Sequence, residues 1–288
     1  MTDTEGWFAA GDPDDLEALA AAVREGSADE PRAWPRLATE AGFTADEEAY
    51  YDALKEVTTA ATRAAVEERE RADDRQLIHA VRAMDDCRRT ANELTERLAE
   101  WAGTVDPEAA AGLEYARELA EREPKSGEEP LVSLAGRVAD LAEEAEDLRE
   151  YVETQTPSVA PNLAALAGPV LAARLVSLAG GLEKLAKKPS GTIQVLGAED
   201  ALFAHLRGHA PSPKHGIIYT HDAVRGTRLE DRGSAARALA GKLAIAARID
   251  HYSGDYRPEL EAELEARIAT IQARADGADA EDGGITDE

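Results

Sequence analysis

The chain has a single cysteine, Cys87, in 288 residues. One thiol cannot form an intrachain disulfide, so a disulfide framework is excluded, and the composition is typical of proteins that fold in a reducing interior. The sequence also contains no apolar run approaching 18 residues, which argues against a transmembrane helix. Its acidic start, Met1 to Glu5, does not resemble a secretory or transit peptide. We therefore expect a cytoplasmic protein.

Aromatic residues are also scarce. They make up 5% of the chain, although 43% of its residues are hydrophobic, and alanine supplies much of that apolar content. Alanine is the best helix former, whereas strands favour β-branched and aromatic side chains. The composition therefore predicts an all-α fold.

Lysine is rare in a chain that is strongly acidic. Only 7 of the 32 basic residues are lysines, and the net charge is −26. Acid-rich, lysine-poor surfaces are typical of proteins from salt-accumulating cells, so we expect a halophilic source. At about 1 M salt the Debye length is roughly 3 Å. Under those conditions the overall negative charge would hardly repel a nucleic acid.

The motifs of common catalytic sites are missing. His205 and His209 have the i, i+4 spacing of zinc helices, but the general-base glutamate between them is absent and no cysteine lies nearby. The sequence contains no G-x-S-x-G, P-loop or G-x-G-x-x-G pattern. The adjacent Glu199 and Asp200 would diverge by about 100° on a helix, so they are poor candidates for a shared-proton pair. We expect no enzyme, no metal site and no cofactor.

Three stretches flank the main part of the chain. Residues 1–45 read as a reduced N-terminal segment with a short helix and loops, or as a partly disordered acidic leader. Residues 259–274 predict a charged helix. Residues 275–288 are acidic and small, which is typical of a disordered tail.

Residues 46–156 predict a long antiparallel coiled-coil hairpin. From Ala45 to about Trp101 the sequence lacks proline and glycine, and apolar residues recur every three or four positions. A second helix carries a heptad seam that includes Leu131, Leu134, Val138, Leu141 and Leu148. This arm either packs only on itself or also pairs with a second copy as a homodimer, with these five residues forming the dimerisation coiled coil.

Residues 157–258 form the second domain and carry a positive charge. Between residues 160 and 257 the sequence has 13 Lys and Arg against 8 Asp and Glu, a net of +5, which leaves −31 for the rest of the chain. A sign asymmetry of this kind suggests that the positive part meets a negative partner. We expect that partner to be RNA.

Several residues of this domain suit RNA. Lysine and arginine bind phosphates, whereas His215 and Tyr219 are suited to stacking on unpaired bases. Arg237 and Arg248 are 11 residues apart and return to nearly the same helical face, with Lys242 displaced by about 140°. Ser190 or Thr192 is expected to cap a helix that carries Gln194 to Phe203 and to place its positive end near a phosphate.

Several segments closely resemble the Nop domain, an RNA-binding domain of archaeal C/D box ribonucleoproteins with relatives in eukaryotic nucleoli and in the spliceosome. The matching segments in this domain are residues 161–163, 173–175, 191–199, 213–219 and 236–250. Upstream, residues 77–86 and 94–101 are similar to the first coiled-coil helix of the family.

The resemblance implies a non-catalytic scaffold of the C/D box small ribonucleoprotein that guides 2′-O-methylation of rRNA and tRNA. It implies a coiled-coil homodimer whose Nop domain binds the guide RNA kink-turn together with a ribosomal-type kink-turn-binding protein, while fibrillarin transfers the methyl group. The residues expected to contact RNA or the kink-turn protein are Gln194, Gly197, Ala198, Glu199, Lys214, His215, Gly216, Arg232, Arg237, Lys242 and Arg248.

The chain departs from the family pattern at two places. Asp200 stands where the family motif Gly-Ala-Glu-Lys has a cation, which argues against a direct phosphate contact there. The segment before the coiled coil is shorter than the family's α/β domain that docks fibrillarin, so docking would use a reduced surface. The alternative is a coiled-coil interaction protein whose Nop domain binds a kink-turn ribonucleoprotein without supporting methylation.

Overall fold

The computed structural model of the protein describes residues 6–28 and 30–282. Within these ranges the regular elements are fourteen α-helices and two short 3-10 helices, without a strand, which confirms the predicted helical class. The chain divides into two compact units, Met1–Ala72 and Asp73–Glu288. Each unit is described by itself.

The N-terminal unit is a small helical domain built on aromatic side chains. It contains η1 (Trp7–Ala10), α1 (Leu16–Glu25), α2 (Trp34–Glu40) and α3 (Glu47–Arg71). Phe8 and Tyr50 are buried, and Trp7 packs edge-on against Phe43 with ring centroids 5.3 Å apart. The Asp46 carboxylate accepts the Ala49 backbone N–H at 2.8 Å and caps α3. Most of the chain before residue 45 is therefore folded rather than a disordered leader.

The long helix expected between Ala45 and Trp101 is interrupted at Ala72. This residue has an extended backbone (φ −62°, ψ 142°), and α4 begins directly after it with Asp73 and Asp74 in its first turn. Acidic residues are favourable at a helix N-terminus. As a result α3 packs within the N-terminal unit, and the hairpin begins at residue 73 rather than at 46.

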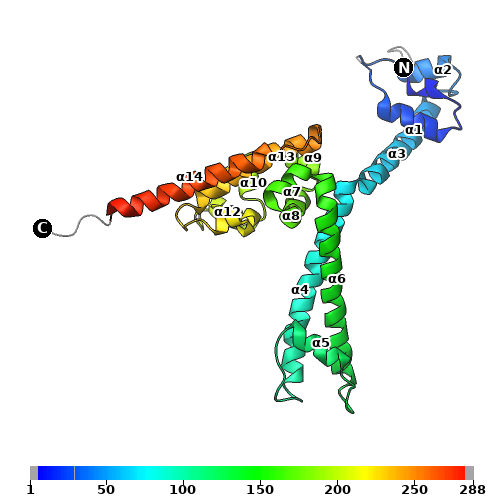
Figure 1. Cartoon of the computed structure of the whole chain (residues 1–288). Helices are drawn as coiled ribbons and strands as arrows, with labels where there is room; N and C mark the ends of the chain where they lie inside the picture. Colours follow the sequence, from blue (N-terminus) through cyan, green and yellow to red (C-terminus); the bar gives the residue numbers. More distant parts are fainter. Residues whose placement is uncertain (1–5, 29, 283–288) are drawn as a thin grey trace. The chain divides into compact units, whose positions relative to one another are not determined.

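The hairpin of the second unit consists of α4 (Asp73–Ala102), α5 (Leu113–Glu121) and α6 (Glu129–Val159). Helices α4 and α6 lie side by side, and α5 packs near their far end (Figure 1). Leu98 of α4, Leu119 of α5 and Leu131 of α6 are buried in one apolar cluster there. Pro157 falls inside the last turn of α6, so the helix continues past residue 156, where the hairpin was expected to end.

The rest of the second unit is a compact helical module. Its elements are α7 (Pro161–Ala167), α8 (Pro169–Ala179), α9 (Leu182–Ala186), α10 (Ser190–Gln194), α11 (Glu199–Leu206), η2 (Ile217–Thr220), α12 (Asp222–Arg225), α13 (Arg232–Tyr252) and α14 (Glu259–Asp282). Helix α13 passes through its centre, with Leu239 and Leu243 fully buried. In the described part of the chain no single helix is long and apolar enough to cross a membrane; α7 and α8 qualify only when joined across their 118° bend.

Helix α14 belongs to this module. Leu260, Leu264 and Ile268 are buried in the same core as α13, and Lys242 of α13 forms an ion pair with Glu263 of α14. The interpretation of residues 259–274 as only a charged helix beyond the domain was therefore incomplete. The helix also reaches Asp282, where a disordered tail was expected from residue 275. Residues 283–288 of that predicted tail lie outside the described residues.

A buried hydrogen-bond network joins the first helix of the module to the end of α13. The Asp250 carboxylate accepts the backbone N–H groups of Asn162 and Leu163 at 3.0 and 2.9 Å and the Asn162 side-chain amide at 2.6 Å. The same asparagine donates to the Asp255 carbonyl and accepts the Arg257 N–H. Asp250 thereby satisfies free donors at the start of α7.

Polar contacts fix the module against the base of the hairpin. The Asp74 carboxylate of α4 accepts the Leu182 N–H at the start of α9 at 3.0 Å. Arg82 of α4 donates to the Ser177 hydroxyl at 3.1 Å. Arg174 of α8 forms a two-pronged ion pair with Asp85 of α4, an arrangement that restricts orientation as well as adding energy.

Candidate functional site

Two segments far apart in the sequence form the centre of the site. The turn after α10 and the loop before η2 are joined by backbone hydrogen bonds, from Gly216 N–H to the Gln194 carbonyl and from Ile217 N–H to the Leu196 carbonyl, both 2.8 Å. The Gln194 side chain also donates to the Lys214 carbonyl at 2.7 Å. We call residues 194–199 the turn and residues 214–219 the loop. The hydrogen bonds hold them as one rigid surface.

Glycine is required on both sides of this junction. A Cβ at Gly216 would lie 2.0 Å from the Leu196 carbonyl oxygen, which is closer than any real contact. Gly197 has φ +83°, in the left-handed region, and a Cβ there would lie 3.3 Å from both Ile217 and Leu178. These two glycines allow the turn and the loop to approach each other.

The expected helix from Gln194 to Phe203 is wrong, because the turn divides it into α10 and α11. Neither Ser190 nor Thr192 caps it: α10 has no side-chain cap, and both residues are exposed. The Glu199 carboxylate instead accepts the Gly197 N–H at 2.9 Å. Glu199 therefore shapes the turn. Asp200 is exposed, and its side chain forms no hydrogen bond with the described residues.

Three side chains form a layered stack, two from the loop and one from the start of α13. The His215 and Tyr219 rings lie 4.7 Å apart and nearly parallel, and the Arg232 guanidinium lies 5.3 Å from the Tyr219 ring centroid. Arg232 also donates to the Thr227 carbonyl at 3.1 Å and to the Tyr219 hydroxyl at 3.3 Å. Arg232 is therefore occupied in positioning Tyr219, which in turn supports His215.

The half-buried imidazole of His215 stays neutral to lower pH than a free histidine. Burial lowers its pKa, the nearby positive charges of Arg232 and Lys214 lower it further, and a backbone hydrogen bond opposes the change. A neutral, flat ring held by a stack beneath it is better suited to stacking on a base than to an ion pair with a phosphate.

The basic residues of α13 divide into two groups. Arg237 and Arg248 are exposed and have no hydrogen-bond or ion-pair partner among the described residues. Lys242 faces α14 and is held by Glu263. Lys214 reaches the start of α13, where its side chain passes 3.8 Å from the Cβ position of Gly233. The structure thus brings the loop next to the start of α13, while it turns Lys242 away.

Helix α11 adds an apolar surface that the sequence reasoning missed. None of its residues is buried, and Phe203 and Leu206 are 56% and 71% exposed. Their i, i+3 spacing places them on one side of the helix. Exposed apolar side chains mark interaction surfaces when they form a contiguous patch. The sequence did indicate this surface: the segment has large apolar residues, but they do not form a stripe long enough to pack against the core.

The five residues expected to form a dimerisation seam pack within one chain. Leu131 and Val138 are buried against α4 and α5, and Leu134 is half-buried beside them. Leu148 packs near Met84 of α4, and Leu141 is half-buried. Packing inside the hairpin accounts for the heptad pattern without a second copy. The homodimer therefore stays a prediction that would need a different face of the hairpin.

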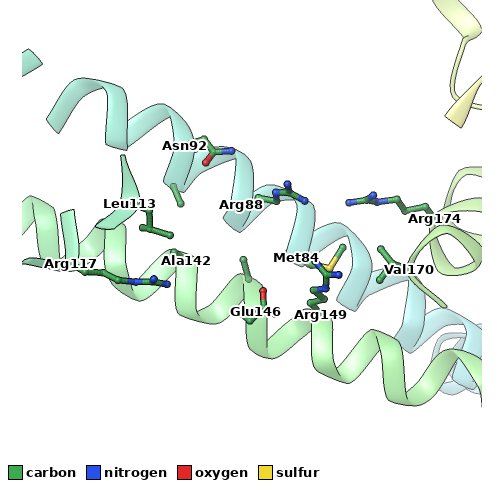
Figure 2. Close-up of a pocket in the computed structure, with 12 residues that line it drawn as sticks. Met84, Arg88, Asn92, Leu113, Arg117, Ala142, Glu146, Arg149, Val170 and Arg174 are labelled. Carbon is green, nitrogen blue, oxygen red and sulfur yellow. The ribbon is translucent and has the colours of Figure 1, made fainter. Parts of the chain in front are cut away.

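Side chains of the hairpin and of α8 line a pocket of about 530 Å³ (Figure 2). Met84, Leu113 and Val170 give it an apolar lining, and its charged residues are Arg88, Arg117, Arg149, Arg174 and Glu146. Arg149 is paired with Glu153 and Arg174 with Asp85. The lining contains no histidine, cysteine or serine, so it offers no nucleophile of those types. No group of three metal-ligating side chains occurs anywhere in residues 6–28 and 30–282.

The fold and this surface define a class of protein: a helical hairpin that carries a compact helical module with a basic and aromatic face. Residues 45–270 match the family model Nop, described as "snoRNA binding domain, fibrillarin". The chain belongs to the Nop family. This confirms the resemblance seen in the sequence.

Relatives and a solved structure support the assignment. An uncharacterized NOP5 family protein of Methanocaldococcus jannaschii is 41% identical over 240 residues, covering 70% of this chain and 58% of the relative. Nucleolar protein 58 of Scheffersomyces stipitis is 32% identical over 245 residues, covering 70% and 48%. The chain thus spans about half the length of these relatives. A crystal structure of a fibrillarin/Nop5p complex contains a chain that is 27% identical, with TM-score 0.52, covering 90% of this chain and 92% of that one.

Proposed function

We propose that this protein is the RNA-binding scaffold subunit of an archaeal C/D box small ribonucleoprotein that guides 2′-O-methylation of rRNA and tRNA. The observation that carries the proposal is the face formed by the loop and α13. It presents a supported His215 ring in the loop and, along α13, two exposed arginines that have no partner among the described residues. Stacking on unpaired bases combined with phosphate binding is how proteins recognise irregular RNA.

The face combines two chemistries that suit a joint RNA–protein surface. Arg237 and Arg248 supply the charge for phosphates, and the apolar Phe203 and Leu206 of α11 supply a surface for protein. We infer that the guide RNA kink-turn meets the basic part and that its ribosomal-type binding protein meets α11. The exposed Asp200, where the family has lysine, reduces the charge between them. This difference favours shape and stacking over simple charge attraction.

Fibrillarin is the proposed catalytic partner, and this chain contributes no catalytic residue of its own. The support is the likeness to a chain in the solved fibrillarin/Nop5p complex. The N-terminal unit, with its aromatic core, is the proposed docking surface. The homodimer, the halophilic source and the RNA targets belong to the same proposal, and the acidic, lysine-poor composition supports the halophilic assignment.

A reconstituted methylation reaction tests this function. The full chain is combined with fibrillarin, the kink-turn-binding protein, a C/D guide RNA and a matching target, and ribose methylation at the guided position is measured. Methylation that requires this chain supports the scaffold. An assembly that binds RNA but never methylates, and from which fibrillarin does not co-purify, would favour the alternative, a coiled-coil interaction protein that retains RNA binding through its Nop domain.

A further inference from the structure

The exposed residues of α13 gather on one narrow stripe, which also contains the half-buried Gly241. It runs through Arg237, Gly241, Ile245, Arg248 and Tyr252, at intervals of three or four positions. On a helix of 3.6 residues per turn this spacing places all of them within about 40° of Gly241. Ile245 is 41% exposed and Tyr252 is 67% exposed, and both arginines are exposed. We call these five residues the α13 stripe.

Gly241 is the unexplained member of the stripe. It lies in the interior of a 21-residue helix, where glycine is less favourable than alanine because it loses more backbone freedom. A Cβ at this position would meet no atom within 4 Å, in contrast to Gly216. Packing within the described chain therefore does not require glycine here. A glycine of this kind suits the close approach of another molecule's backbone.

The charges around Gly241 indicate an anionic backbone. Arg237 precedes it by one turn and Arg248 follows it by two turns, so the two arginines span about 16 Å along the helix. Helical side chains lean toward the N-terminus, which directs Arg248 over Ile245 toward Gly241. Guanidinium groups bind phosphates in a two-pronged geometry. Neither arginine has a partner within the described residues that would compete for this role.

The far end of the stripe adds an aromatic ring beside further positive charge. Tyr252 lies within electrostatic range of Lys187, which follows α9 and forms an ion pair with Glu183, and α9 packs against α13. Lys184 and Lys188 belong to the same short segment. An exposed ring next to cations is the arrangement on which single-stranded bases stack.

We propose that an RNA strand lies lengthwise along the α13 stripe, with its backbone closest to the helix at Gly241 and an unpaired base on Tyr252. This inference rests on the proposed function and deepens it. It gives the direction of the strand relative to α13, and it adds Gly241 and Tyr252 to the residues that position RNA.

The first test replaces Gly241 with leucine in the full chain. Leucine is a good helix former that cannot hydrogen-bond a phosphate, so the fold should keep or raise its thermal midpoint while the larger side chain blocks the strand. We expect about tenfold weaker binding to a kink-turn RNA preloaded with its ribosomal-type protein, a loss of about 1.4 kcal/mol. Gly136→Leu is the matched control, because Gly136 is also a mid-helix glycine with open space at its Cβ position. It should bind like the unchanged chain.

The second test compares two exposed tyrosines. Tyr252→Ala removes the ring on the stripe, whereas Tyr256→Ala removes a 55% exposed ring in the connection to α14. We expect several-fold weaker RNA binding for the first and unchanged binding for the second. This pair decides the matter if Gly241→Leu lowers the thermal midpoint.

Specific results would overturn the inference. If Gly241→Leu and Tyr252→Ala bind normally while Arg237→Ala weakens binding, the RNA does not follow the stripe but the proposed function stands. If none of these changes affects RNA binding, the proposed RNA face fails as well. If Gly241→Leu instead weakens binding to the kink-turn protein without RNA, the stripe is a protein surface.

Discussion

Removing the buried carboxylate of Asp250 should destabilise the module strongly. Asp250 is 8% exposed and accepts three N–H groups, two from the start of α7 and one from the Asn162 side chain. In Asp250→Ala these donors lose their acceptor, and each unsatisfied buried donor costs about 1–3 kcal/mol. Burial raises the pKa of Asp250, although its hydrogen bonds oppose the change, so desolvation of the carboxylate offsets part of its benefit. Three such donors give about 3–9 kcal/mol in total, and we expect a loss of about 3 kcal/mol, at the lower end of that total.

Native-state hydrogen exchange measures this loss of stability at the individual amides around Asp250. Protection of the amides of α7 and of the last turns of α13 should fall by the full amount, while the amides of α1 to α3 in the separate N-terminal unit should not change. Asp255→Ala is the control, because the Asp255 carboxylate is exposed and its one ion pair, with Arg257 at 3.8 Å, is long and lies at the surface. Its effect should stay within about 0.5 kcal/mol. A loss below about 1 kcal/mol for Asp250→Ala would refute the reasoning.

Two further predictions concern the centre of the site. Gly216→Ala should lower the free energy of unfolding by about 1–3 kcal/mol and reduce the hydrogen-exchange protection of the turn, because the new Cβ would press on the Leu196 carbonyl. Gly191→Ala is the control, because a Cβ there meets open space. Equal effects of the two substitutions would contradict this explanation. NMR titration of His215 should give a midpoint below the ordinary value of about 6.5. Since the unfolded chain then binds more protons, the contribution of His215 to stability is complete above about pH 6.5 and is lost as the pH falls through the folded-state pKa. A midpoint at or above 6.5 would contradict this.

The parts of the fold that depend on local periodicity could be predicted from the sequence. The apolar residues of α4 and α6 recur every three or four positions, and both helices pack as a pair. The interruption at Ala72 gave no comparable signal, since neither proline nor glycine lies near it. Helix α14 was predicted to be a charged helix outside the domain because it has many charged residues. The spacing of Leu260, Leu264 and Ile268 already indicated a buried side.

The site could be predicted as a set of residues but not as a geometry. Its main members, His215, Arg237 and Arg248, follow from residue type and family resemblance. The conformation of Gly197 depends on Ile217, twenty positions later, and the position of Lys242 depends on Glu263 of α14. Contacts of this kind join distant parts of the chain, so no local pattern reveals them. For the same reason one expected helix became α10, a turn and α11.

The loop and α13 are proposed to bind a kink-turn protein that already carries its RNA. The most direct measurement is a titration of the full chain, at fixed high salt, against a kink-turn RNA preloaded with its ribosomal-type protein. His215→Ala and Arg237→Ala should each weaken binding about tenfold. Arg137→Ala makes the same charge change on the hairpin, where Arg137 pairs only with Asp140, and should leave the affinity unchanged. Unchanged affinity in both His215→Ala and Arg237→Ala would contradict the account.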